Sequence, residues 1–171
     1  MWIFGFGSLM TDGWEATFDC KNREIAQLDG YRRVFNKLSV ANWGTHDCPC
    51  PTLNLEEAEG ATCVGVAFEF DDSQGTKLDV YLVEREGKGF LPREVRATLR
   101  NGRSVVARVW VYGGRHSSFF NEPEALVRAV RQAAGHSGRC YDYVERIHSQ
   151  LSVIGIDDPA VTHLWRTISG Q

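Results

Sequence analysis

The sequence of 171 residues lacks a long apolar run, a low-complexity segment and an internal repeat. No stretch approaches the roughly 20 apolar residues that a membrane-spanning helix needs. The first residues carry no basic cluster and no extended hydrophobic stretch, so they do not resemble a secretory signal. We therefore expect neither a membrane protein nor a secreted one. The composition, 43% hydrophobic and 24% charged, is that of a globular chain and excludes disorder for all but the last few residues.

An excess of positive charge is also missing, since the formal net charge is -3. A protein that binds a nucleic-acid duplex is expected to carry a basic face or stripe. The nearest candidates, residues 31–33 and 93–103, are short and are flanked by acidic or apolar residues. We therefore expect no nucleic-acid partner.

Cysteine is scarce and scattered. The chain has five cysteines, an odd number, so we expect free thiols in a reducing cytoplasm and no disulfide scaffold. His46, Cys48 and Cys50 share one short segment and are plausible ligands for a soft metal. A closed zinc site, however, needs four ligands in paired spacings. A surface loop is the favoured interpretation, with metal binding or a Cys48–Cys50 redox pair left as alternatives. The cysteines are Cys20, Cys48, Cys50, Cys63 and Cys140.

Several segments have the composition and alternation of β-strands. Residues 2–4 form a short apolar run, residues 31–40 are rich in β-formers, and residues 64–70 alternate between apolar and other positions. Residues 95–99 and 105–111 alternate on either side of Asn101-Gly102, which predicts a β-hairpin closed by a two-residue turn. Residues 42–51 contain glycine, aspartate and prolines and are predicted to be a loop.

Other segments have apolar residues at helical spacing. A short helix is predicted from about Thr76 to Arg85, ended by Gly87 and Gly89. Three apolar stripes with helical spacing, at residues 126–134, 141–151 and 161–168, predict a helical last third. This order favours an α+β fold with a curved, mostly antiparallel sheet and flanking helices. The length suits a single domain over residues 1–171.

The first candidate for a functional site is the loop Gly5-Phe6-Gly7-Ser8. Glycines after a buried strand permit positive φ and let backbone N–H groups approach a ligand, although a tight turn needs the same glycines. The loop is not a dinucleotide-binding fingerprint, because no third glycine follows in a βαβ context. It is not a Gly-x-Ser-x-Gly elbow either, and no Ser/His/Asp spacing supports Ser8 as a nucleophile.

The second candidate is Glu86. A charged helix end followed by glycine is common on protein surfaces, but Glu86 ends an apolar-striped helix where glycines turn the chain into the next strand. A carboxylate at such a place can point into a cleft. Glu84 projects about 200° away, so only one of the two acids is expected to face inward. Burial raises the pKa of a carboxyl group, as general acid–base catalysis near neutral pH requires.

Three blocks of the sequence resemble the ChaC-type γ-glutamylcyclotransferases, in the family's order and at similar spacings. Residues 2–9, WIFGFGSL, are similar to its Phe-Gly-Tyr-Gly-Ser-Leu opening. Residues 82–90, LVEREGKGF, are similar to its Arg-Glu-x-Gly-Gly-Tyr segment, whose glutamate is catalytic. Residues 133–139, AAGHSGR, followed by Tyr143, resemble its Ala-Ala-Gly-x-Ser-Gly-x signature.

The resemblance implies a small β-barrel with flanking helices and an enzyme that needs no cofactor or metal. The implied reaction is an intramolecular attack of the α-amine of a γ-glutamyl group on its γ-carbonyl, which releases 5-oxoproline; glutathione is the substrate of the ChaC branch. It assigns Glu86 as the catalytic acid/base. The implied substrate-binding residues are Ile3, Phe4, Gly5, Phe6, Gly7, Ser8, Leu9, Tyr112 and Tyr143.

This chain departs from the family pattern at several positions. Phe6 and Phe90 replace family tyrosines, Cys140 stands where asparagine is usual, and residues 35–53 look more like other γ-glutamylcyclotransferase branches. A cyclotransferase for γ-glutamyl amino acids or γ-glutamyl amines therefore stays open, and packing in the core would explain Tyr112 and Tyr143 equally well. A non-catalytic ligand-binding module and a Cys/His metal protein are the alternatives from other classes.

Overall fold

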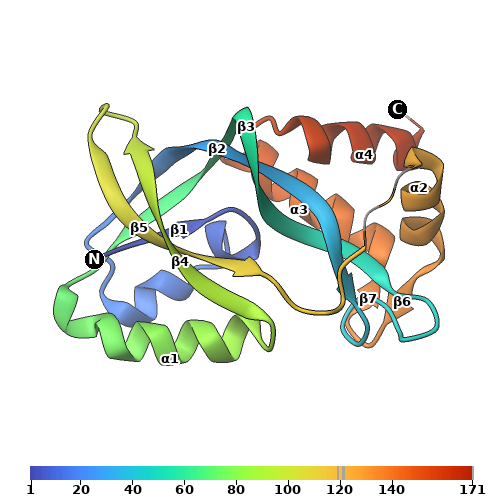
Figure 1. Ribbon diagram of the computed structural model, residues 1–171, viewed down its shortest axis with the longest axis horizontal. Helices are drawn as coiled ribbons and strands as arrows, with labels where there is room; N and C mark the ends of the chain where they lie inside the picture. The colour runs from blue at the N-terminus through green and yellow to red at the C-terminus, as the bar shows by residue number, and fades with distance from the viewer. Residues whose placement is uncertain (119, 121, 171) are drawn as a thin grey trace. The chain divides into compact units, whose positions relative to one another are not determined.

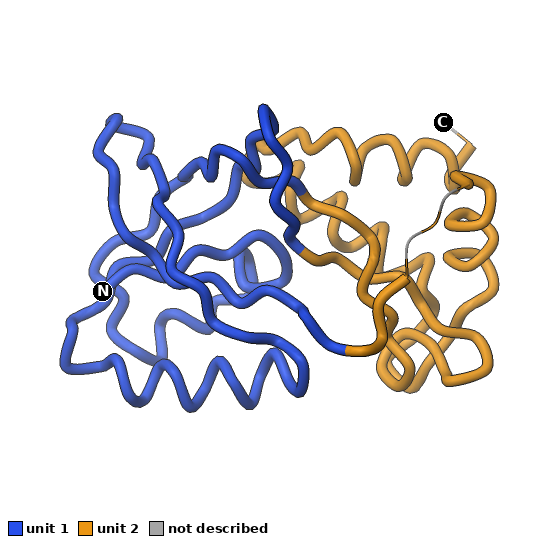
Figure 2. The backbone as a smooth tube through the Cα atoms, in the orientation of Figure 1, with its two compact units in different colours: residues 1–32, 55–114 blue, residues 33–54, 115–171 orange. Residues whose placement is uncertain are grey.

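The computed structural model describes residues 1–118, 120 and 122–170. These residues divide into two compact units (Figure 2). Unit 1 comprises residues 1–32 and 55–114, and unit 2 comprises residues 33–54 and 115–171. The single domain expected over residues 1–171 is not tested by this division and stays a prediction.

Five strands form a closed barrel (Figure 1). The strand order around the barrel is β1-β3-β2-β4-β5. β1 pairs antiparallel with β3 and parallel with β5, while β4 pairs antiparallel with both β2 and β5. The small, mostly antiparallel barrel is therefore confirmed. The strands are β1 (Trp2–Gly5), β2 (Asn22–Ser39), β3 (Cys50–Glu69), β4 (Phe90–Leu99) and β5 (Ser104–Tyr112).

β1 is a buried strand because it is paired on both sides. Ile3 and Phe4 have no exposed surface. Their neighbour across the sheet is β3, and at Gly65 of β3 a Cβ atom would lie 2.4 Å from the Gly5 carbonyl oxygen and 2.6 Å from the Phe4 ring. Only glycine permits so close an approach of strand to strand.

Two strands are longer than the sequence predicts. β2 begins at Asn22 instead of residue 31, and β3 begins at Cys50 instead of residue 64, within the predicted loop. The start of β3 does not show the apolar alternation of a strand in the sequence, because Thr52 and Asn54 are polar yet buried. The Thr52 hydroxyl donates to the Lys37 carbonyl (3.0 Å) and the Asn54 amide to Asn36 Oδ1 (3.1 Å), which satisfies both side chains.

The predicted hairpin is confirmed as β4 and β5, but its turn is different. Leu99 N–H donates to the Arg103 carbonyl (2.9 Å), so three residues, 100–102, form the loop instead of two. Gly102 has φ of +83°, the left-handed conformation that a three-residue hairpin loop requires at this point.

The predicted helices are confirmed. α1 ends at Glu86, and Gly87 follows with φ of +82°. α2 ends at Gln132, before the predicted end of its stripe, because Ala134 and Gly135 form β6, which pairs with β7 (Gly138–Arg139). Among the described residues, no helix is long and apolar enough to cross a membrane. The α-helices are α1 (Gly75–Glu86), α2 (Pro123–Gln132), α3 (Cys140–Val153) and α4 (Pro159–Ser169), and the 3-10 helices are η1 (Ser8–Met10), η2 (Trp14–Phe18) and η3 (Asp72–Gln74).

A buried ion pair joins β2 to α4 within unit 2. The Arg33 guanidinium lies 2.9 Å from Asp158, and their side chains are 0% and 9% exposed. Asp158 is also the N-cap of α4, where its carboxylate accepts hydrogen bonds from the N–H groups of Ala160 and Val161. One carboxylate thus neutralises a buried cation and fixes the start of a helix.

The cysteine prediction is wrong for two of the five residues. Cys50 and Cys140 form a disulfide, and both are completely buried. It links residues 90 positions apart, at the starts of β3 and α3, with a Cα–Cα distance of 5.5 Å. Such a pairing depends on tertiary approach, which spacing along the chain does not reveal. It also rules out a Cys48–Cys50 redox pair in this structure; the cysteines that remain free are Cys20, Cys48 and Cys63.

Arg33→Met tests the buried ion pair. Removal of the guanidinium leaves the Asp158 carboxylate buried without an opposite charge, which we expect to lower the free energy of unfolding by about 3–5 kcal/mol. The matched control is Arg32→Met, because Arg32 is 60% exposed and pairs with Glu56 at the surface. That change is expected to cost less than about 1 kcal/mol. Urea unfolding of both variants measures the difference, and equal losses would contradict a special role for Arg33.

Gly65→Ala tests the close approach of β1 to β3. The added methyl group collides with backbone and ring atoms that cannot move separately, so we expect the variant to lose about 3 kcal/mol of stability or to fail to fold. Gly7→Ala is the control, because φ at Gly7 is -131° and its Cβ would meet nothing within 4 Å. Its melting temperature should stay near that of the parent protein. A stable Gly65→Ala variant would show that the barrel accommodates the methyl group by another route.

Candidate active site

The glycine loop leads directly from the barrel into a 3-10 turn. β1 ends at Gly5, and the turn closes where Met10 N–H donates to the Gly7 carbonyl (3.0 Å). Most of the predicted substrate-binding segment is buried, namely Ile3, Phe4, Gly5, Phe6 and Leu9. Gly7 is half-buried and Ser8 is exposed, so these two residues offer the accessible backbone of the loop.

The loop glycines do not use the positive φ that glycine permits. Gly7 has φ of -131°, and Gly5 is not among the glycines with positive φ. Gly5 is needed for packing instead, because a Cβ there would lie 3.2 Å from Leu9 Cβ and 3.3 Å from the Phe68 ring. The N–H groups of Ser8 and Leu9 precede the first hydrogen bond of the 3-10 turn, so the turn itself does not use them.

Glu86 lies at the point where α1 stops. It is half-buried, whereas Glu84 is exposed, as their spacing on the helix predicts. Gly87 N–H donates to the Val83 carbonyl (3.1 Å), and Gly87 and Gly89 both have positive φ, +82° and +96°. The chain therefore leaves the helix directly after Glu86 and enters β4 at Phe90.

Tyr112 packs beside the turn that follows Glu86. Tyr112 ends β5, is 8% exposed and pairs in register with Phe90, whose ring centroid is 5.2 Å from its own. A Cβ at Gly89 would lie 2.6 Å from the Tyr112 ring, and a Cβ at Gly114 would lie 2.5 Å from its hydroxyl oxygen. Two glycines thus make room for the phenol.

The strand register brings these elements to one edge of the barrel. β1 and β5 run parallel, with Trp2 opposite Ala107, so both strands end at the same edge. β4 is antiparallel to β5 and therefore begins there, with Phe90 opposite Tyr112. The loop after Gly5, Tyr112 and the turn after Glu86 are accordingly all attached to strand ends at this edge, which we call the barrel-edge site.

An ion pair that the sequence analysis missed joins two parts of this site. Arg85, the residue before Glu86, binds the carboxylate of Asp12, which follows the 3-10 turn of the glycine loop. The resemblance to a family motif covers Arg85 but says nothing of its partner. No local signal marks Asp12, because the two residues are 73 positions apart.

Tyr143 belongs to unit 2, whereas the other predicted site residues belong to unit 1. Its hydroxyl accepts a hydrogen bond from Leu53 N–H (3.0 Å), and its ring packs against Trp43 at 5.5 Å. These contacts give Tyr143 a structural role, and its contact with substrate stays a prediction.

The third block that resembles the family also has a packing role in unit 2. A Cβ at Gly135 would lie 2.4 Å from the Ala41 carbonyl oxygen and 2.5 Å from that of Asn42. The N–H groups of His136 and Ser137 donate to the same two carbonyls, at 3.1 and 2.7 Å. The small residues of this block thus let a hairpin approach the segment before Trp43.

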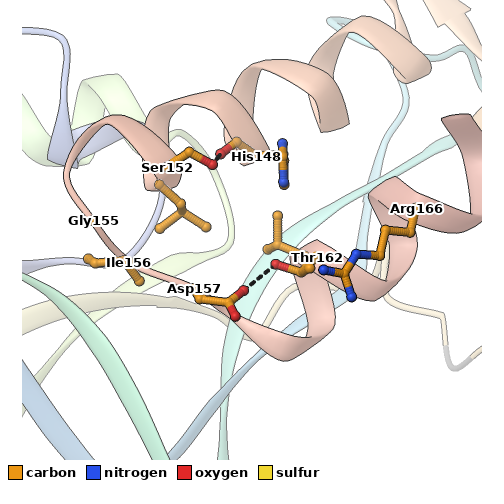
Figure 3. Close-up of a pocket in the computed structure, with 9 residues that line it drawn as sticks. His148, Ser152, Gly155, Ile156, Asp157, Thr162 and Arg166 are labelled. Atoms are coloured by element: carbon orange, nitrogen blue, oxygen red, sulfur yellow. Dashed lines mark hydrogen bonds between the residues drawn. The ribbon is translucent and has the colours of Figure 1, made fainter. Parts of the chain in front are cut away.

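A separate cavity of about 330 Å³ lies between α3 and α4 in unit 2 (Figure 3). Within it the Asp157 carboxylate accepts a hydrogen bond from the Thr162 hydroxyl (2.5 Å). Its charged residues Asp157 and Arg166 are exposed, and it contains none of the predicted site residues. The lining residues are His148, Leu151, Ser152, Gly155, Ile156, Asp157, Val161, Thr162 and Arg166.

The His46–Cys50 segment does not form a metal site in the part of the chain that the structure describes. No three side chains of histidine, cysteine, aspartate or glutamate come together there as metal ligands. Cys50 is held in the disulfide, and the His46 ring packs against His116 with centroids 5.8 Å apart.

Solved structures support the fold. A crystal structure of a glutathione-specific γ-glutamyl cyclotransferase from yeast superimposes with a TM-score of 0.84 at 18% identity, over 99% of this chain and 96% of that one. A second structure, titled gamma-glutamyl cyclotransferase, gives 0.53 at 12% identity, over 100% of this chain and 99% of that one.

Sequence comparison gives the family. Gamma-glutamylcyclotransferase 2-1 of Arabidopsis thaliana is 31% identical over 100% of this chain and 83% of its own length. The glutathione-specific gamma-glutamylcyclotransferase of Escherichia coli K12 is 29% identical over 96% of this chain and 71% of its own length. The family model described as "ChaC-like protein" matches residues 1–171, and the chain therefore belongs to the ChaC-like family.

Proposed function

We propose that this protein is a γ-glutamylcyclotransferase that cleaves glutathione into 5-oxoproline and cysteinylglycine. The observation that carries the proposal is the half-buried Glu86 at the end of α1, whose following turn enters β4 at the barrel edge where β1 and β5 end. Membership of the ChaC-like family and the names of its relatives support the same activity. A non-catalytic binding module would have no need for a carboxylate at this position, and Glu86 is present.

Glu86 is proposed to move the protons of the reaction. The α-amine of the γ-glutamyl group is an ammonium at neutral pH, so it must lose a proton before its nitrogen attacks the γ-carbonyl carbon. A new C–N bond then closes the five-membered ring, and the bond from that carbon to the cysteine nitrogen breaks. The attacking nitrogen loses a second proton as it becomes the lactam N–H. The leaving nitrogen takes up one proton as its bond breaks and another when the free amine becomes an ammonium at neutral pH. One carboxylate between the two nitrogens can accept a proton from the attacking nitrogen and donate it to the leaving nitrogen.

The loop is proposed to hold the substrate folded. Ring closure needs the flexible γ-glutamyl chain to bend so that its amine reaches its own carbonyl, and much of the rate gain is therefore positional. Negative charge on the substrate's α-carboxylate and on the carbonyl oxygen requires preorganised N–H donors. The accessible backbone at Gly7 and Ser8 is the part of the loop that can supply them.

Two phenylalanines at the barrel edge bear on the choice of substrate. Phe6 is 8% exposed, and Phe90 packs against Tyr112. The family resemblance places tyrosines at both positions, so two hydroxyl groups are missing here. Loss of these polar groups favours a second candidate within the same reaction class, a cyclotransferase for γ-glutamyl amino acids or amines.

The remaining expectations stay proposals. We propose a small-molecule γ-glutamyl substrate, no nucleic-acid partner and a cytoplasmic location. Cys20, Cys48 and Cys63 are free thiols, as a reducing cytoplasm favours, whereas the Cys50–Cys140 disulfide is a type of bond that is rare in that compartment. The proposed substrate-binding roles of the loop residues, Tyr112 and Tyr143 likewise rest on the resemblance.

Glu86→Gln should abolish formation of 5-oxoproline from glutathione, because the amide keeps the shape of the side chain but cannot accept the proton. We expect a fall in kcat of at least about 100-fold. Glu84→Gln is the matched control: Glu84 is two residues away on the same helix and exposed, and it should retain kcat within about twofold. Full activity of Glu86→Gln would refute the mechanism. An equal fall in kcat for Glu84→Gln would show that Glu86 is not the special carboxylate that the mechanism requires.

A substrate panel separates the two candidates. We expect kcat/KM for glutathione to exceed that for γ-glutamylalanine and for a γ-glutamyl amine by about tenfold or more, since about 1.4 kcal/mol of transition-state binding gives that factor. The rate of 5-oxoproline release is measured for each compound with the purified protein. A higher value for γ-glutamylalanine would assign the chain to the second candidate, and no product from any of them would refute both.

A further inference from the structure

Arg85, which precedes Glu86 in the last turn of α1, makes hydrogen bonds to two other side chains. Its guanidinium donates to the Tyr81 hydroxyl (3.0 Å) and to the Asp12 carboxylate. The side chains of Arg85 and Asp12 are 21% and 26% exposed, so the ion pair is partly shielded from water. Burial acts to lower the pKa of Arg85, but the hydrogen bonds to Asp12 and Tyr81 raise it above its usual value, and the charge persists at all working pH values.

Asp12 belongs to the same short segment as the glycine loop. Two residues separate it from Leu9, whose carbonyl accepts a hydrogen bond from the Trp14 indole (2.9 Å). The Trp14 ring stacks on Tyr81 of α1, with centroids 5.8 Å apart and planes inclined by 15°. The loop is thus attached to α1 by aromatic stacking near Tyr81 and by the ion pair at Arg85.

The position of the ion pair matters because it joins the end of a helix to a loop that leaves the barrel. Glu86 is the last residue of α1 and precedes two glycines with positive φ. On the loop side, Gly7 touches nothing at its Cβ position. Helix ends and loops of this kind open at low free-energy cost unless side chains hold them.

We propose that the Arg85–Asp12 ion pair is a positioning device that holds the proton-carrying Glu86 in register with the substrate-holding loop. Arg85 and Asp12 themselves do not touch the reacting atoms in this proposal. The inference rests on the proposed function for its catalytic consequence. Its structural part, the coupling of the loop to the helix end, stands independently. A displacement of about 1 Å between a catalytic group and its substrate can cost a factor of about 100 in rate.

A second ion pair on α1 provides a matched control. Asp79, six residues before Arg85 on the same helix, binds Arg108 of β5 at 2.7 Å, with side chains 44% and 38% exposed. This pair attaches α1 to the barrel without involving the glycine loop. Asp12→Asn and Asp79→Asn therefore remove the same kind of interaction from the same helix, and only the first breaks the link to the loop.

The kinetic test compares these variants with glutathione as substrate. We expect Asp12→Asn to lower kcat about tenfold or more with KM within about twofold, because the helix end and the loop lose register in the transition state. Asp79→Asn should retain kcat. The double variant Asp12→Asn/Arg85→Met should be no slower than Arg85→Met alone, which shows that the two residues act as one unit. Equal kcat values for Asp12→Asn and Asp79→Asn would overturn the proposal.

Amide hydrogen exchange makes the test independent of activity. Asp12→Asn should speed exchange in both residues 6–11 and residues 82–90, whereas Asp79→Asn should leave the loop protected. Unchanged exchange at either segment in Asp12→Asn would overturn the positioning role. Lack of activity in the parent protein would instead refute the proposed function, so the two failures are distinguishable.

Discussion

The pairing of β1 on both sides is the constraint on which the barrel-edge site depends. β1 is antiparallel to β3 and parallel to β5, and the parallel register sends the chain out of the barrel at the edge where β5 ends. Gly65 permits the approach of β3, because any side chain there would collide with Gly5 and Phe4. If β1 paired in another register, the glycine loop would leave the barrel away from Tyr112 and from the turn after Glu86.

Local periodicity predicts the elements whose neighbours are adjacent in sequence. The hairpin of β4 and β5 and the end of α1 at Gly87 follow from alternation, helical spacing and glycine. The early part of β3 could not be predicted in this way. Thr52 and Asn54 are buried because their hydrogen-bond partners lie on β2, and a polar residue with a distant partner looks the same in sequence as a residue of a loop.

In the candidate site, too, contacts between residues that are distant in the sequence could not be predicted. Glu86 could be singled out before the structure, because the geometry of a helix end separates it from Glu84 and a family motif contains it. Its neighbour Arg85 had no predicted role, because the partner Asp12 lies 73 positions away. The Cys50–Cys140 disulfide was missed for the same reason, with 90 positions between the two residues. Sequence reasoning thus identified the group proposed for the chemistry, whereas the contacts that hold it needed the fold.

Resemblance to a family motif does not by itself give a residue a chemical role. Gly135 is explained by the carbonyl oxygens of Ala41 and Asn42, which leave no room for a side chain. The Tyr143 hydroxyl accepts a hydrogen bond from Leu53, which a packed tyrosine in any protein would also require. Glu86 lies in the same kind of family motif, but it is also half-buried at the end of α1, directly before the turn into β4 at the barrel edge. The proton-carrying role of Glu86 stays a proposal that combines this position with the chemistry that a carboxylate can perform there.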